Sequence, residues 1–332
     1  MVTGLRPKTG IGMGVSAGVG AGLVWGLAFP IPVLLHGWNA VTVTAGRYIA
    51  YGLISAIFFA VGGRQLHRLA VDHWRTALLF AVSGNVGYYL LLVVGIATVG
   101  APATDLVIGS IPIVLALVGN WVAPVYAWRR IVVPVVLVMI GLVIVNTLEI
   151  AGTRAYNPAP TVVKIAGLIA ALGAVAIWSW YALANARFLA DHPDTSPAGW
   201  STVVGVATGA VTFVAMPLAW ATGQLAPSAS AENISSLIVG AIILGVAVSW
   251  GGTWLWNAAS SRLPPALAGL LINVETVSGF AYVYAARWQW PAAGQLIGFA
   301  LVVLGVIAAP YRKPSFNGRS PGWRIRPGAT DR

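Results

Sequence analysis

About ten stretches of this chain are each long and apolar enough to cross a lipid bilayer as a helix. A membrane-spanning helix needs roughly 20 mostly apolar residues to cross a hydrocarbon core of about 30 Å. Because no water is present there to bond the backbone, the chain is predicted to be an all-α integral membrane protein. The predicted spans are residues 10–35, 39–62, 74–97, 100–122, 131–149, 163–188, 197–221, 235–258, 263–286 and 291–311.

Composition supports this prediction and excludes several classes of function. Hydrophobic residues make up 58% of the 332 residues and charged residues 8%, so ten helices leave no room for a separate globular domain. The absence of cysteine excludes a disulfide framework, a thiolate metal site and a cysteine nucleophile. The four histidines (His36, His67, His73 and His192) are predicted to lie in loops without metal-ligand spacing. No Walker A, GxSxG or HExxH motif occurs, so we expect no cofactor, no metal and no enzymatic activity.

The basic residues are distributed unevenly between the predicted loops. With a cytoplasmic N-terminus, fifteen of the 19 lysines and arginines lie on the cytoplasmic side, and Arg47 lies within a span. Arg154, Lys164 and Arg287 fall on the opposite side. Loops rich in lysine and arginine stay in the cytoplasm, so both termini are predicted to be cytoplasmic and the number of spans even. The net charge of +11 is thereby explained by membrane orientation, and no nucleic-acid partner is expected.

Short similarities between the two halves of the chain indicate an internal repeat. Ala101-Pro102-Ala103 opens the fourth span as Pro264-Pro265-Ala266 opens the ninth. A repeat of five spans is odd, so the second copy is inserted upside down, an arrangement typical of secondary transporters. The predicted organisation is a cytoplasmic N-terminus (1–9), a first five-helix repeat (10–149), a periplasmic linker (150–162), a second five-helix repeat (163–311) and a disordered, basic cytoplasmic tail (312–332).

Several motifs, in their order and spacing, resemble the EamA type of the drug/metabolite transporter superfamily. They are Trp25-Gly26, Gly46-Arg47-Tyr48, Gly84-Asn85 followed by Tyr88-Tyr89, Gly100-Ala101-Pro102 leading to Gly109-Ser110-Ile111-Pro112, Trp178-Ser179-Trp180-Tyr181-Ala182 with Asn185-Ala186-Arg187, Trp256-Asn257 and Glu275-Thr276. The resemblance covers residues 10–311 and is nearest to a group of poorly characterised bacterial inner-membrane permeases. It implies a helical bundle with a central cavity that exports small metabolites such as amino acids. Many EamA-type chains carry proline at the position of Glu275, so roles known for better-studied exporters do not transfer to that residue.

Three ionisable residues within the predicted spans are the first candidates for a transport site. A charged side chain in the bilayer costs about 2.5–3.5 kcal/mol on insertion scales and is a functional candidate by default. Glu275, near the middle of span nine, is expected to bind an amino group or take up a proton, or alternatively to pair with Arg47. Arg47 is expected to bind a substrate carboxylate, with structural pairing or snorkelling as the alternative. Asp105 lies near the start of span four, where it either caps the helix dipole or lines the pathway.

Polar and aromatic residues within the spans form a second set of candidates for the substrate pathway. Aromatic rings suit apolar substrate groups, and amides supply orienting hydrogen bonds. For each single aromatic residue, ordinary helix packing is the competing interpretation. The candidates are Asn85, Tyr88, Tyr89, Trp178, Trp180, Tyr181, Trp250, Trp254, Asn257 and Asn273, with Pro30, Pro32 and Pro112 as sites of helix bending or gating.

These observations predict a secondary transporter in the bacterial inner membrane. It would export amino acids or related small metabolites by alternating access, with proton coupling through Glu275 as a hypothesis. Its expected partners are a small-molecule substrate and the lipid bilayer, and it would act as a monomer or homodimer. The alternatives are an exporter of hydrophobic drugs, for which an aromatic lining alone suffices, and a membrane interaction protein that transports nothing.

Overall fold

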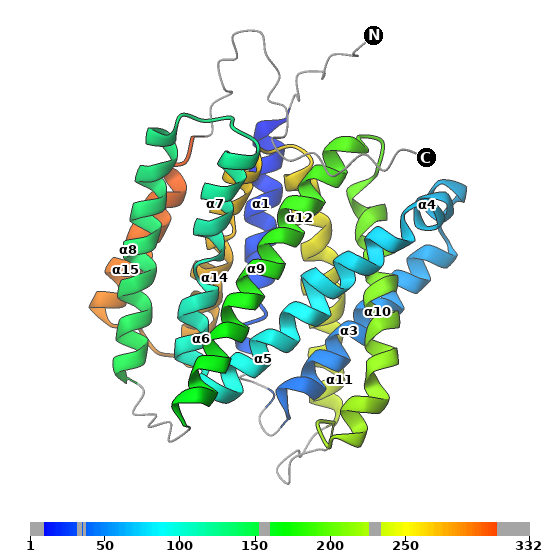
Figure 1. Cartoon of the computed structure of the whole chain (residues 1–332), viewed down its shortest axis with the longest axis horizontal. Coiled ribbons are helices and arrows are strands. Elements are labelled where there is room, and N and C mark those ends of the chain that lie inside the picture. Colours follow the sequence, from blue (N-terminus) through cyan, green and yellow to red (C-terminus); the bar gives the residue numbers. More distant parts are fainter. Residues whose placement is uncertain (1–9, 32–34, 36–37, 153–159, 226–233, 311–332) are drawn as a thin grey trace.

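The computed structural model describes residues 10–31, 35, 38–152, 160–225 and 234–310, and in these ranges it contains helices and turns but no strand. The helices form a bundle in which most elements run from one end to the other (Figure 1). Within these ranges, eight helical segments are long and apolar enough to cross a membrane. Two shorter apolar helices, Ile11–Gly26 and Ala293–Ile307, lie within the first and tenth predicted spans. The predicted N-terminal segment and basic tail lie outside the described residues, as does most of the predicted linker.

The first half of the chain contains eight described elements. They are α1 (Ile11–Gly26), α3 (Ala40–Ala60), α4 (Arg64–Ala81), the π-helical turn η1 (Val82–Val86), α5 (Gly87–Val99), α6 (Ala101–Ile108), α7 (Ile111–Val122) and α8 (Trp128–Gly152). The second half contains α9 (Thr161–Asp191), α10 (Pro197–Ala221), α11 (Ile234–Ile242), the π-helical segment η2 (Ile243–Gly251), α12 (Gly252–Ser260), α13 (Pro265–Leu271), α14 (Asn273–Ala286) and α15 (Ala293–Ile307).

Departures from regular α-helix occur at corresponding places in the two halves. In the third predicted span, η1 lies between α4 and α5, and in the eighth η2 lies between α11 and α12. The fourth span is broken at Gly109–Ser110 and the ninth at Ile272. Segments of π-helix and discontinuous membrane helices both concentrate at functional sites. The four irregular spans therefore indicate where a site is to be sought.

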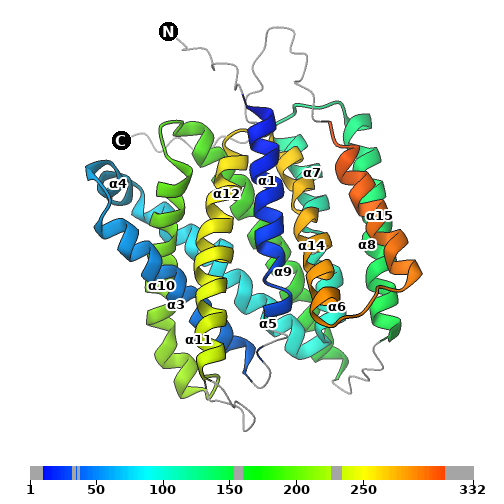
Figure 2. The same cartoon turned by 180° about the vertical axis from the view of Figure 1, so that it is seen from behind.

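The helices pack in pairs that join the two halves. α8 packs on α15, α3 on α10, and α7 on α13. Two further pairs correspond to each other: α5 packs on α9 as α12 packs on α1. Figures 1 and 2 show α8 and α15 side by side at one edge of the bundle, with α3 and α10 toward the other. Each half thus buries its apolar faces largely against the other half, and neither forms a separate core.

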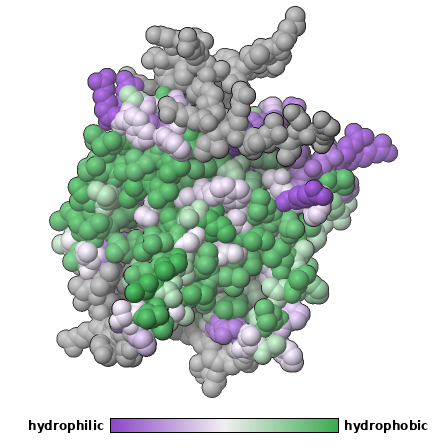
Figure 3. Space-filling view, viewed as in Figure 1, coloured by the Kyte–Doolittle hydropathy of each residue, from purple (hydrophilic) through white to green (hydrophobic). Residues whose placement is uncertain are grey.

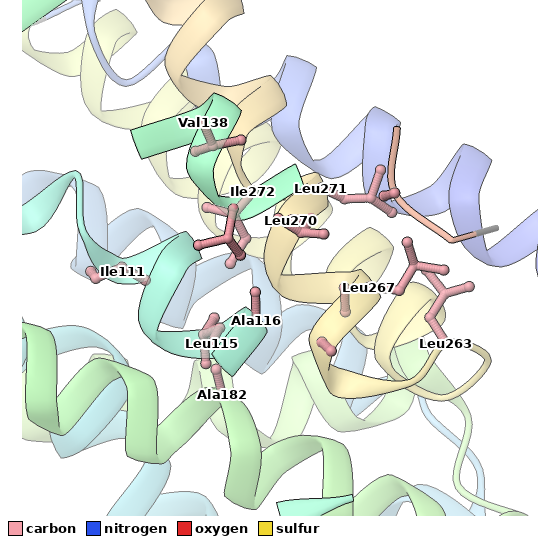
Figure 4. Packing of buried hydrophobic residues seen from close by; sticks show 14 of the residues in the cluster. Ile111, Leu115, Ala116, Val138, Ala182, Leu263, Leu267, Leu270, Leu271 and Ile272 are labelled. Carbon is pink, nitrogen blue, oxygen red and sulfur yellow. The ribbon is translucent and has the colours of Figure 1, made fainter. Parts of the chain in front are cut away.

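The largest hydrophobic cluster lies where the broken helices of the two halves meet. Leu115 and Ala116 of α7 are buried against the face of α13 that carries Leu267, Leu270 and Leu271 (Figure 4). This cluster anchors both broken spans beside their interruptions. The irregular backbone at Gly109–Ser110 and at Ile272 is therefore held by a packed core.

The outer surface is that of a membrane protein. Large apolar side chains are exposed along several helices, including Ile169 (64%), Phe213 (71%) and Val214 (77%). A space-filling view shows a broad hydrophobic face, with hydrophilic residues gathered mainly toward its upper rim (Figure 3). The start of α1 and the end of α15 lie at the same end of the bundle (Figure 2).

The prediction that all four histidines lie in loops is wrong for His67. α4 begins at Arg64, ten residues before the predicted span, so His67 lies within a helix, whereas His73 lies at a kink where the backbone is not helical (φ −125°, ψ 21°). Its first turns bury Leu66 and Leu69 only in part and expose Arg64 and Arg68. Such an amphipathic segment has low mean hydropathy, and a search for continuous apolar runs therefore misses it. His36 lies outside the described residues, and His192 follows the end of α9.

The crossing of α3 and α10 predicts a specific packing defect. A methyl group at Gly52 would lie 2.6 Å from the Cα of Gly209, and one at Gly209 would lie 2.6 Å from the Cα of Gly52. Gly52→Ala is therefore expected to destabilise the protein by about 1–3 kcal/mol, the usual cost of overpacking. The measurement is the thermal unfolding midpoint in detergent. Gly173→Ala in α9 is the matched control, since its added methyl group would make only ordinary contacts, the nearest at 3.5 Å. Equal midpoints for the two variants would contradict the prediction.

Candidate functional site

Arg47, Tyr88 and Glu275 come from three helices, and their charges are close enough to interact. Tyr88 lies in α5 immediately after η1, and Glu275 lies in the first turn of α14, just after the break at Ile272. Tyr88 is close enough to experience the charges of both Glu275 and Arg47. The positive end of the α14 dipole favours a carboxylate in this position.

A close approach of α1 fixes the backbone beside Glu275. A methyl group at Gly22 of α1 would lie 2.9 Å from the backbone nitrogen of Glu275. The hydroxyl of Ser278, one turn further along α14, donates a hydrogen bond to the Gly22 carbonyl at 3.1 Å. The first turn of α14 is thus held against α1 by direct backbone packing, which positions the carboxylate.

Arg47 is held by a polar group of η2 and does not pair with Glu275. Its Nε donates to the Ser249 hydroxyl at 2.8 Å, and its guanidinium carbon lies 5.5 Å from the centre of the Tyr48 ring. Arg47 and Glu275 attract each other electrostatically, but these two described side chains form no ion pair. The pairing considered as the structural alternative is therefore absent from this conformation. Both charges keep the capacity to bind a further group.

An aromatic wall adjoins these charges. Tyr88 lies 6.3 Å from Trp178 between ring centres, Trp178 lies 6.3 Å from Trp25, and Trp25 lies 5.6 Å from Trp256. Arg47, Tyr88, Trp178 and Glu275 are all partly exposed although they lie within the bundle. We call Arg47, Tyr88, Trp178, Glu275 and the rings of Trp25 and Trp256 the central site.

Hydroxyl groups of α10 bind the predicted polar candidates of the third and eighth spans. Asn85 in η1 donates to the Thr208 hydroxyl at 3.0 Å, and the indole of Trp250 donates to the Thr202 hydroxyl at 3.1 Å. The Ser201 hydroxyl in turn donates to the Trp250 carbonyl at 2.9 Å. The sequence analysis did not select these α10 residues. Ser201 and Thr208 lie seven residues apart and so on one face of a predicted span, and this spacing is the signal that would have found these two.

Asn257 lies in a buried network and not at the central site. Its side chain is fully buried and accepts a hydrogen bond from Asn185 at 2.9 Å. Asn185 in turn accepts one from the indole of Trp200 at 2.9 Å, and both of these residues are also fully buried. Because each amide uses its partners within the protein, this group holds α9, α10 and α12 together. In this conformation the Asn257 side chain is not accessible to a substrate.

Other predicted residues divide between the interior and the surface. Trp180 is 47% exposed and continues an exposed apolar stripe of α9 that includes Leu172 (58%). Trp254 is 42% exposed, whereas Tyr181 is buried at 6%. Asp105 is exposed on α6 but interacts electrostatically with Tyr88.

Tyr89 and Asn273 both donate hydrogen bonds to backbone carbonyls. The Tyr89 hydroxyl donates to the Ala40 carbonyl at 2.9 Å. The Asn273 side chain is fully buried and donates to the Leu270 carbonyl at 2.9 Å, across the break before α14. Its carbonyl oxygen has no hydrogen-bond partner among the described residues. Asn273 thus stabilises the interruption two residues before Glu275.

The predicted prolines mark the ends of helices more than bends within them. Pro112 is the second residue of α7, where the missing N–H costs no helical hydrogen bond. Pro30 is buried and follows the turn at residues 27–29 after α1. Pro32 lies outside the described residues. Among the residues that the structure describes, no three histidine, aspartate or glutamate side chains are grouped as metal ligands would be.

The buried network predicts a structural effect for a residue first selected as a substrate ligand. Asn257→Leu leaves the Asn185 amide without its acceptor, and an unsatisfied buried polar group costs about 1–3 kcal/mol. The thermal unfolding midpoint should fall, while the folded protein keeps its substrate affinity. The control is Asn146→Leu, because Asn146 bonds only to the carbonyl of Leu142, one turn away. A variant with an unchanged midpoint and weakened substrate binding would place Asn257 in the pathway after all.

Comparison with known proteins is consistent with this geometry. Residues 12–147 match the EamA-like transporter family. The inner membrane protein YtfF of Escherichia coli (strain K12) is 34% identical over 310 residues, which cover 91% of this chain and 96% of that protein. A solved crystal structure superimposes with a TM-score of 0.70 at 19% identity, covering 89% of this chain and 96% of the solved one. At that identity the superposition shows the fold alone.

Proposed function

This chain belongs to the EamA-like transporter family of multi-pass inner-membrane proteins, and from that premise we propose that it is a secondary transporter that exports amino acids or related small metabolites. The substrate would bind at the central site. Access to that site would alternate between the two sides of the membrane.

The proposed architecture has ten spans in two inverted repeats, residues 10–149 and 163–311, with both termini in the cytoplasm. The reciprocal helix pairs support it, because α5 with α9 and α1 with α12 are exchanged by a two-fold relation between the halves. The matched positions of η1 with η2, and of the breaks in spans four and nine, support it as well. α1 and α15 are 16 and 15 residues long, which is shorter than the roughly 20 residues of a typical span. That these two helices cross the membrane is therefore part of the proposal.

The unpaired opposite charges of Arg47 and Glu275 carry the substrate proposal. A guanidinium binds a carboxylate through two parallel hydrogen bonds, and a carboxylate binds an ammonium group. Two such charges near Tyr88 match the two charges of an amino acid. The indole rings of Trp25 and Trp178 then offer an apolar wall to its side chain. A purely hydrophobic drug would leave both charges unsatisfied in a low-dielectric site, which costs free energy.

Alternating access requires a gated pathway, and we assign the gating to the broken spans. The break at Ile272 lies three residues before Glu275, and the break at Gly109–Ser110 occupies the corresponding place in the other half. A substrate that bridges Arg47 and Glu275 would draw α3 and α14 together. Its binding would thereby favour one state of the bundle over the other. Proton coupling is the further part of this proposal, with Glu275 as the group that takes up the proton.

Binding and flux measurements test this function. Purified protein is screened for thermal stabilisation against a panel of amino acids, amines without a carboxylate and hydrophobic drugs. A ligand that binds the folded state stabilises it by RT ln(1 + [L]/Kd), so millimolar ligand reveals a millimolar or tighter site. Stabilisation by zwitterions, with efflux of the same compounds from liposomes, is expected. Stabilisation by drugs alone would favour the drug exporter, and neither binding nor flux would favour a membrane interaction protein.

A further inference from the structure

A groove of about 440 Å³ opens at one end of the α8–α15 pair. Arg129, Arg130 and Val133 from the start of α8 form one side, and Ala308 and Ala309 after the end of α15 form the other. The pair lies at the edge of the bundle, far from the central helices (Figures 1 and 2). The groove is thus separate from the central site and independent of the proposed function.

No described residue compensates the charge in this groove. Both arginines are exposed, and among the described residues neither side chain forms an ion pair or a hydrogen bond. They lie in the first turn of α8, where the partial positive charge of the helix dipole adds to their own. This end of α8 therefore attracts an anion.

The surroundings place this charge at the level of lipid headgroups. Trp128 beside the arginines is 47% exposed, as is usual for an indole at a membrane interface. Val133 (58%), one turn further along α8, and Ile307 (65%), the last residue of α15, expose apolar surface. A ligand in the groove would therefore meet cationic side chains at one end and a hydrocarbon-facing surface at the other. A free inorganic anion would use only the first of these features.

We propose that this groove binds the phosphate headgroup of an anionic membrane lipid. Arg129 and Arg130 contact the phosphate, and the acyl chains lie along the exposed apolar faces of α8 and α15. Basic grooves between membrane helices are suited to such headgroups, because charge and hydrocarbon are presented together. Since α8 and α15 also pack on each other, a bound lipid would bridge the last helix of each half.

The test compares two lipids and a soluble anion on the full-length protein in neutral detergent. Phosphatidylglycerol is expected to raise the thermal unfolding midpoint in a saturable way. Phosphatidylethanolamine and millimolar inorganic phosphate should give little or no shift. Native mass spectrometry is expected to show one or two phosphatidylglycerol molecules retained per chain. An equal shift with inorganic phosphate would identify a soluble anion as the ligand and overturn the lipid assignment.

Variants separate this groove from a general effect of positive charge. Arg129→Gln with Arg130→Gln should weaken phosphatidylglycerol binding at least tenfold. Arg64→Gln with Arg68→Gln makes the same change of charge on exposed positions of α4 and should leave the binding unchanged. Ala308→Phe keeps both arginines but fills the groove, and it too should reduce lipid retention. Equal losses in the α4 control and the α8 variant, or full retention in Ala308→Phe, would refute the proposed site.

Discussion

Glu275→Gln is expected to abolish most substrate accumulation, although the folded protein should be preserved. Glutamine has nearly the same shape as glutamate, but it can neither carry the charge that binds an ammonium group nor take up a proton. Charge-assisted hydrogen bonds contribute about 1.5–3 kcal/mol, which corresponds to a loss of about 10- to 150-fold in affinity. The measurement is export into, or counterflow across, liposomes that contain the purified variant.

The control for Glu275→Gln is Tyr284→Phe, which removes one polar group from the same helix. Tyr284 lies nine residues after Glu275, and its hydroxyl donates a hydrogen bond to the Gln295 side chain at 2.7 Å. We expect this variant to transport like the unmodified protein. An imposed proton gradient tests the coupling separately. If Glu275→Gln binds substrate more weakly but still accumulates it fully under the gradient at saturating substrate, Glu275 is a ligand and not the coupling group.

The membrane helices could be predicted from the sequence because hydrophobicity is a property of each segment by itself. The span predicted at 197–221 coincides with α10 (Pro197–Ala221). The amphipathic start of α4 could not be predicted in this way, since its residues are stabilised by partial burial against neighbouring helices. The breaks at Gly109–Ser110 and Ile272 likewise depend on packing between the halves.

The sequence predicted which charged residues belong to the candidate site but not which residues they contact. Charged residues within spans are rare enough that Arg47 and Glu275 stand out in the sequence alone. Their partners do not, because Ser249 lies 202 residues from Arg47 in the chain. Asn257 and Asn85 look alike in the sequence. Only the structure shows that Asn257 is fully buried against Asn185, whereas Asn85 lies partly exposed in η1.

Arg47→Lys is expected to weaken binding of amino acids by at least tenfold, although it keeps the positive charge. The guanidinium donates through Nε to Ser249 while its terminal nitrogens stay available to a carboxylate. A lysine ammonium is a single point of charge and cannot hold both partners in that planar geometry. Arg47→Gln should bind amino acids more weakly still, because it also removes the positive charge. Ser249→Ala should reduce the affinity for amino acids by a smaller factor. It removes only one hydrogen bond that orients Arg47, and such a bond contributes about 0.5–1.5 kcal/mol.

Ligands that lack a carboxylate distinguish substrate binding from helix packing at Arg47. An amine with the same side chain as a bound amino acid offers nothing to the guanidinium and keeps its contact with Glu275. Arg47→Gln should therefore weaken binding of the amino acid at least tenfold and leave that of the amine unchanged or improved, since a nearby positive charge is removed. A double-mutant cycle with Ser249→Ala measures how far the two residues act as one unit. If the amine and the amino acid lose affinity equally, Arg47 holds α3 against η2 and the carboxylate binds elsewhere.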